Sequence, residues 1–176
     1  NDLELAKKNY PKRWITRRRD ASLTLFLLHT GLRLSEAIGL RMTDLELSER
    51  KGSISVQNGK GNKQRNVPLN SDARKALQDW IAVRPGCDHL WMTVEGEHES
   101  LSGRTVQRIL QRYAKAANIK ELTPHICRHT FAKNLVDSGA GLEKVAALLG
   151  HSSLNTTRIY IATSERDLEL AVEHIS

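Results

Sequence analysis

Two short segments of alternating polarity constrain the fold most strongly, because the chain's other patterned segments have helical spacing. Residues 53–57 (SISVQ) alternate as a strand does, and residues 64–69 (QRNVPL) form a second such segment. The linking sequence NGKGNK is rich in Gly and Asn, which are typical of tight turns. The pattern predicts a β-hairpin, and hence a small antiparallel sheet in a mainly α-helical α+β domain.

Helix signals fill most of the remaining sequence. The segment ASLTLFLLHT should form an apolar helix that ends at Gly31. Ser71 is expected to cap a helix that ends before Pro85-Gly86, and Ser102 to begin a helix with one apolar and one basic face. Residues 89–92 (HLWM) are expected to form a short edge strand. Helices are predicted at 32–41, 72–83, 104–118 and 141–150, and an amphipathic tail helix at 164–176.

Length and composition limit the kinds of protein that this chain can be. A length of 176 residues suits one domain, and no run approaches the ~18 apolar residues of a membrane span. The first residues are too polar for a signal peptide. Lys and Arg number 27 against 20 Asp and Glu, an excess that favours nucleic acid or another polyanion as partner. Cys87 and Cys127 are far apart and are expected to be reduced thiols in a cytoplasmic protein.

The run HICRHTFAKNL, at 125–135, points to an anion site. Thr123 can cap a helix, and Pro124 suits its first position. His125, Arg128 and His129 would then share one face of that helix. The face is polar and largely cationic, which is unsuited to a hydrophobic core.

Several strong polar groups stand at turns and helix ends, and each has an ordinary interpretation when taken alone. Arg33 would pair with Glu36 one turn on, Lys60 at the hairpin tip would be solvated, and Tyr160 between two isoleucines would belong to the core. The histidines would bond backbone carbonyls. Together they form a coherent chemical set: Arg33, Lys60, His125, Arg128, His151 and Tyr160.

This set suits phosphoryl transfer without a metal. Two guanidiniums can hold non-bridging phosphate oxygens and neutralise charge that develops in the transition state. A histidine can remove the proton of the tyrosine, and the other can hydrogen-bond the phosphate. A lysine on a mobile tip can protonate the leaving alkoxide, while the tyrosine attacks and keeps the bond as a covalent ester.

Two other kinds of site, a zinc site and a P-loop, are disfavoured by the sequence. His125 and His129 are four residues apart and could chelate zinc, but the chain has no HExxH, no CxxC and no acidic residue in this run. A P-loop is excluded because GKGNKQ lacks the GxxxxGK[ST] spacing. We therefore expect no metal and no other cofactor.

Four segments in this order resemble the catalytic domain of the tyrosine recombinase (phage integrase) family. The resemblance extends from about Ile15 to Thr163, and its HxxRH, LGH and terminal Tyr spacing is specific. The segments are TGLRLSEAIGLRMTDL, GKGNKQRNVPL, HICRHTFAKNLVDSG and LLGHSSLNTTRIYIAT.

The resemblance implies a role for each member of the set. Arg33 and Arg128 would clamp the phosphate, and Tyr160 would be the nucleophile that forms a 3′-phosphotyrosyl bond with DNA. Lys60 matches the general-acid lysine better than Lys63, because it holds the first position of the GKGxK turn.

Three further positions match the family. His125 is similar to its first histidine, with base-like duty, and His151 to its second. Glu36 resembles the acid that supports the first arginine. The implied fold is the recombinase catalytic fold, related to type IB topoisomerases, and the implied reaction needs neither ATP nor a metal.

The implied partner is a double-stranded DNA recombination site, bound by four subunits, with a monomer expected in isolation. Contacts to DNA phosphates are expected from Lys63, Arg65, Arg104 and Arg108. The tail helix would pack on a neighbouring subunit or on its own domain. The protein would be cytoplasmic, nucleoid-associated when bound to DNA, and not in a membrane.

One difference from the family concerns extent, because members usually carry an N-terminal helical domain that this chain starts too late to contain. We expect the catalytic domain of a longer protein, in preference to an unusually minimal one. Two other functions would suit part of this pattern. A type IB topoisomerase would use similar chemistry, and a DNA-binding regulatory module would have lost catalysis. The compact motif spacing and the intact set of residues favour an active recombinase.

Overall fold

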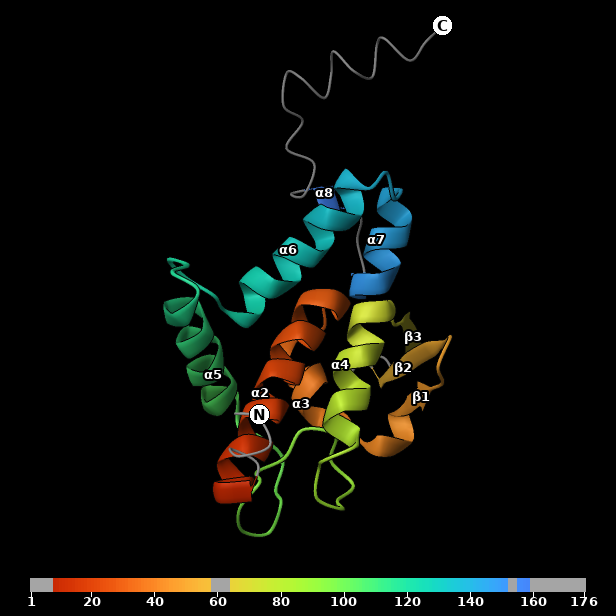
Figure 1. The fold of residues 1–176 in the computed structure, drawn as a ribbon. Helices are drawn as coiled ribbons and strands as arrows, with labels where there is room; N and C mark the ends of the chain where they lie inside the picture. Colours follow the sequence, from red (N-terminus) through yellow and green to blue (C-terminus); the bar gives the residue numbers. More distant parts are fainter. Residues whose placement is uncertain (1–7, 58–63, 152–154, 159–176) are drawn as a thin grey trace, which may run out of the picture.

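A computed structural model describes residues 8–57, 64–151 and 155–158 (Figure 1). A long helix, α2 (Pro11–Thr30), runs through the middle of the domain, and α4 (Ser71–Ile81) and α6 (Pro124–Asp137) pack against it. In Figure 1, α5 (Gly103–Ala116) lies on one side of α2 and the sheet on the other. The other elements are α3 (Leu34–Gly39), the 3-10 turn η1 (Met42–Asp44), β1 (Leu45–Leu47), β2 (Gly52–Gln57), β3 (Gln64–Pro68), α7 (Leu142–Leu149) and α8 (Asn155–Arg158).

The sheet confirms the predicted antiparallel pairing and adds a strand to it. Its order is β1-β2-β3, with Ile54 of β2 opposite both Leu45 and Val67. Ile54 and Val67 are fully buried, so one face of the sheet belongs to the core. The predicted turn at 58–63 lies outside the described residues. The mainly helical fold with a small antiparallel sheet is therefore confirmed.

Helix α2 starts earlier than its apolar pattern predicted. It begins at Pro11, so the basic segment that precedes the apolar run is helical too. Its end at Gly31 is confirmed, with a left-handed φ of 61°. A Cβ at Gly31 would lie 2.3 Å from a ring carbon of Phe131, so both conformation and space require glycine there.

Local capping signals predicted several helix starts correctly. The side chain of Ser102 accepts a hydrogen bond from the Thr105 amide, and Thr123 from the Ile126 amide at 3.2 Å. The predicted cap of α4 was wrong. The side chain of Asn70, and not that of Ser71, accepts the hydrogen bond from the Ala73 amide. The strand expected at 89–92 was also wrong: this segment forms only isolated bridges at its two ends, and its centre is buried.

The core is centred on aromatic side chains of α2, α4 and the segment after α4. Trp80 and Trp91 stack with ring centroids 6.4 Å apart, and Phe26 lies 5.2 Å from Trp91. All three are fully buried, which stabilises the fold by roughly 1.5–3 kcal/mol for a side chain of this kind. A smaller cluster, around Val145 and Leu149, joins α6 to α7.

Helix α2 carries two buried charged residues, Arg19 and Asp20. Asp20 is 1% exposed and accepts hydrogen bonds from Arg19, at 2.6 and 2.9 Å, and from Arg112 of α5. The side chain of Arg112 is 57% exposed, although its guanidinium bonds this buried carboxylate. The network ties α5 to α2.

Two further expectations concern cysteines and membranes. Cys87 and Cys127 are both free thiols. In the described part of the chain, none of the helices combines the length and apolar character that crossing a bilayer requires.

Candidate active site

Three of the candidate residues, Arg33, Arg128 and His151, meet at the carboxyl end of α7. Gly150 ends the helix in a left-handed conformation, with φ 67°, and its amide donates to the Ala147 carbonyl at 3.1 Å. The His151 amide donates to Ala146 at 3.0 Å. The next three carbonyls, of residues 148 to 150, have no further turn of helix to bond. Each of them accepts a hydrogen bond from a different arginine.

The three arginines come from separate elements. The pairs are Arg65 Nε with the Leu148 carbonyl at 3.1 Å, Arg128 Nη2 with the Leu149 carbonyl at 2.8 Å, and Arg33 Nη2 with the Gly150 carbonyl at 3.1 Å. A helix carries partial negative charge at this end, which favours cations. The end of α7 therefore gathers three guanidiniums into one place.

Arg128 is the most deeply placed of the three. Its Nη1 donates to the Gly31 carbonyl at 2.7 Å, so its guanidinium joins the ends of α2 and α7. The sequence predicted an anion-facing helix surface shared with His125 and His129. The structure places these residues differently, because Arg128 is only 7% exposed while both histidines are exposed. Backbone carbonyls make the burial of this charge tolerable.

Arg33 is the arginine of the cluster that solvent reaches most. Its side chain is 44% exposed, whereas that of Glu36 is 9% exposed. Arg33 precedes the first turn of α3, and Glu36 accepts from its amide at 2.8 Å and from its Nη1 at 3.0 Å. Glu36 thus fixes both the backbone and the side chain of Arg33.

Glu36 stays ionised in this environment. Burial raises the pKa of its carboxyl, but hydrogen bonds from Arg65 and from the Arg33 backbone, with the charge of Arg65, outweigh burial and lower the pKa below its ordinary value. The carboxylate is therefore a permanent negative partner for two arginines near neutral pH.

His151 follows Gly150 directly. Its Nδ1 lies 2.9 Å from the hydroxyl oxygen of Thr157, a fully buried side chain that orients the ring. Burial lowers the pKa of His151, and so do the positive charges of Arg128, Arg33 and Arg65. A neutral imidazole at pH 7 is suited to accept a proton or to bond a phosphate oxygen.

The remaining predicted site residues are either outside the described residues or exposed on α5 and α6. Lys60, Lys63 and Tyr160 lie outside the described residues, as does the tail helix at 164–176. Among the described residues, no hydrogen bond or ion pair joins His125 to the cluster. Arg104 and Arg108 are exposed on α5, as the basic face predicted, and Arg108 donates to Thr105 at 3.4 Å.

Two members of the site were missed or misread from the sequence. Arg65 was expected at the DNA surface, yet its side chain is 11% exposed and bonds Glu36. A signal existed, because Arg65 is two residues from the buried Val67 and so shares its face of β3. Thr157 gave no signal.

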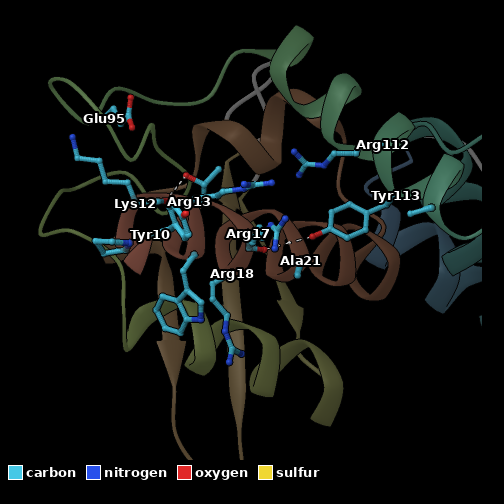
Figure 2. Close-up of a pocket in the computed structure, with 13 residues that line it drawn as sticks. Tyr10, Lys12, Arg13, Arg17, Arg18, Ala21, Glu95, Arg112 and Tyr113 are labelled. Carbon is cyan, nitrogen blue, oxygen red and sulfur yellow. Dashed lines mark hydrogen bonds between the residues drawn. The ribbon is translucent and has the colours of Figure 1, made fainter. Parts of the chain in front are cut away.

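A separate groove of about 1220 Å³ lies between the start of α2 and the end of α5. Figure 2 shows its basic side chains, including Lys12, Arg13 and Arg17, and the Tyr113 hydroxyl that donates to the Arg17 carbonyl at 3.5 Å. The arginine cluster lies at the other end of α2, whose 20 residues span roughly 30 Å. The groove is therefore distinct from the candidate site.

Within the ranges that the structure describes, no three His, Cys, Asp or Glu side chains come together in a group that could hold a metal ion. The expectation that no metal takes part stays a prediction.

The fold and the cluster define a helical domain with an anion-handling site. It holds one solvent-facing guanidinium, two mostly buried guanidiniums and a histidine of lowered pKa. Bidentate guanidiniums match the oxygens of a phosphate group, and a neutral imidazole beside them can transfer a proton.

Comparison with known proteins identifies the family. The model of the phage integrase family matches residues 9–166. Tyrosine recombinase XerC of Corynebacterium glutamicum is 38% identical over 154 residues, which is 85% of this chain and 48% of that protein. The crystal structure of XerA recombinase superposes with a TM-score of 0.75 at 28% identity, covering 99% of this chain and 61% of the other.

A second solved structure is similar to the same degree. The XerH site-specific recombinase, in its pre-cleavage complex with a difH substrate, has a TM-score of 0.76 at 29% identity and covers 91% of this chain and 47% of its own. The chain belongs to the phage integrase family and has the tyrosine recombinase catalytic fold. It spans about half the length of the curated relatives it matches.

Proposed function

We propose that this chain cuts and rejoins DNA strands at specific sites through a covalent phosphotyrosine intermediate. The observation that carries the proposal is the meeting of Arg33, Arg128 and His151, from three separate segments, at the end of α7. The side chain of Arg33 is exposed enough to bind the phosphate oxygens of a DNA strand, and its ion pair with Glu36 holds it in place. Membership of the phage integrase family supports the same function.

The reaction is a transesterification at phosphorus. The hydroxyl oxygen of Tyr160 attacks the scissile phosphate, its bond to phosphorus forms, and the bond from phosphorus to the 5′ oxygen breaks. Lys60 gives a proton to that leaving oxygen. Attack by a 5′ hydroxyl of another strand reverses these steps and frees the tyrosine. Each step conserves one phosphodiester, so no ATP is needed.

The remaining residues serve this step. Arg33 and Arg128 stabilise the charge that develops on the phosphate oxygens. His125 accepts the proton of the tyrosine, and His151 hydrogen-bonds the phosphate. Glu36 is the supporting acid of Arg33. Neither a metal nor another cofactor takes part in this scheme.

DNA is held by charges around the site. Lys63 in the hairpin and Arg104 and Arg108 on α5 contact phosphates, which give affinity and salt dependence more than sequence choice. The domain alone is a monomer, and four copies assemble on two DNA sites. Residues 164–176 pack on a neighbouring subunit or on their own domain. The reaction takes place on cytoplasmic DNA.

Covalent trapping tests the proposal. The protein is incubated, with and without EDTA, with nicked duplexes that carry a randomised core, and adducts resistant to SDS are quantified. The proposal expects an adduct with wild type and with Tyr113→Phe, and none with Tyr160→Phe. DNA binding should be nearly unchanged in both variants. Binding without any adduct in wild type would favour a regulatory DNA-binding module, and loss of adduct only in the presence of EDTA would revive a metal mechanism.

A further inference from the structure

Arg65 makes more contacts in the cluster than its place on a surface hairpin suggests. It extends from β3, and its Nη1 and Nη2 donate to the two oxygens of Glu36 at 3.0 and 2.8 Å. Its Nε donates to the Leu148 carbonyl at 3.1 Å. One planar fork therefore joins three elements: β3, α3 and the end of α7.

The backbone beside this fork leaves room for nothing larger than a hydrogen. A Cβ built on Gly150 would lie 2.8 Å from Nη1, 2.9 Å from Cζ and 3.1 Å from Nε of Arg65. The guanidinium is thus packed directly against the turn that connects α7 to His151. Such close approach fixes the turn relative to β3.

We propose that Arg65 is a positioning residue that sets the arrangement of Arg33 and of the end of α7. It acts on Arg33 through their shared partner, Glu36, and on the turn before His151 through the Leu148 carbonyl. This inference rests on the proposed function for its effect on catalysis, but its structural half stands apart from that function. It takes the place of the direct DNA contact that the sequence led us to expect for Arg65.

Geometry distinguishes the two roles. A residue that contacts DNA needs an exposed side chain, and Arg104 and Arg108 of α5 are exposed. Arg65 instead directs all three of its guanidinium nitrogens at protein acceptors and is 11% exposed. Arg33, 44% exposed, shares the carboxylate of Glu36 and the end of α7 with it. Arg65 is therefore placed to fix an arginine that meets solvent.

Hydrogen exchange tests the structural half without any DNA. Amide exchange is compared in peptides covering 146–151 and, as an internal reference, α5. Arg65→Ala should speed exchange in 146–151 by about tenfold or more, because the amides of Gly150 and His151 close this turn, and should leave α5 unchanged. Arg65→Lys keeps the positive charge and replaces Arg65→Ala as the test variant if the alanine variant fails to fold. Arg74→Ala is the matched control, since Arg74 donates to the Leu69 carbonyl at 2.9 Å outside the cluster.

Adduct formation in a single turnover, at saturating nicked duplex, tests the functional half. Misplaced reacting groups should slow it on the order of tenfold to a hundredfold in Arg65→Ala, with the DNA Kd within about twofold of wild type. Arg65→Lys should not rescue the rate, because one ammonium cannot replace the fork.

The outcomes separate the two claims. Unchanged protection of 146–151 overturns the positioning role, whether or not wild type forms adducts. A raised Kd with a salt slope lower by about one and a normal rate overturns it in favour of a DNA contact. Lost protection together with an inactive wild type supports positioning and refutes the proposed function.

Discussion

Replacing Gly150 by alanine isolates the contact between the α7 turn and Arg65. Gly150 has φ 67°, and its new methyl group would meet the Arg65 guanidinium at 2.8–3.1 Å. Gly139, which follows α6, offers a matched control. It has φ 82°, and a Cβ there would have nothing within 4 Å. Both variants share the backbone strain, and only Gly150→Ala adds the collision.

The magnitude follows from these two terms. Left-handed backbone costs a non-glycine residue roughly 1–2 kcal/mol, so Gly139→Ala should lower the free energy of unfolding by about that amount. At Gly150 the methyl group must also displace a flexible side chain, which costs little by itself. Displacement breaks at least one charged hydrogen bond, worth about 1.5–3 kcal/mol. Gly150→Ala should therefore cost roughly 2.5–5 kcal/mol in total.

Urea unfolding followed by circular dichroism measures both variants under the same conditions. The expected result is that Gly150→Ala loses at least about 1.5 kcal/mol more than Gly139→Ala, with equal m values. In an Arg65→Ala background this extra loss should vanish, since the collision is gone. Equal losses in the two glycine variants would refute the packing of Arg65 against this turn.

Three other predictions follow from the site. Arg104→Ala combined with Arg108→Ala should weaken binding to all DNA sequences alike and reduce the salt slope by about 2; an unchanged slope in a binding titration would remove them from the interface. Lys60→Ala should slow cleavage of an ordinary strand but spare a substrate whose 5′ leaving group needs no proton, and equal loss on both would exclude Lys60 as the acid. The lowered pKa of Glu36 gives stability that is present above pH 4.5 and is lost as the pH falls through the folded-state pKa; unfolding free energies measured across this range should show a flatter decline for Glu36→Gln than for wild type.

Sequence patterns predicted the parts of the fold that local chemistry determines. The helix end at Gly31 and the caps at Ser102 and Thr123 depend on neighbouring residues alone, and all were confirmed. The strand β1 was missed because three residues are too few for an alternation to show. The segment 89–92 is apolar because it crosses the core. A short apolar run is equally compatible with a strand and with an irregular buried segment, so the sequence alone did not separate the two.

The candidate site was predicted in its residue types more than in its geometry. Motif spacing indicated Arg33, Arg128 and His151, and the structure brings them to one helix end. The burial of Arg128 could not be read from its helix face, because its partners are carbonyls of Gly31 and Leu149 that only tertiary packing supplies. The buried Asp20 network was missed for the same reason.

The central claim is that Tyr160 forms the covalent bond to DNA, and mapping the adduct tests it most directly. Wild-type protein is trapped on nicked duplexes in EDTA, digested with protease and nuclease, and the nucleotide-bearing peptide is identified by mass spectrometry. The chain has 3 tyrosines, so the assignment is unambiguous. The account predicts the phosphodiester on Tyr160. A nucleotide on Tyr10, on Tyr113 or on a serine would contradict it.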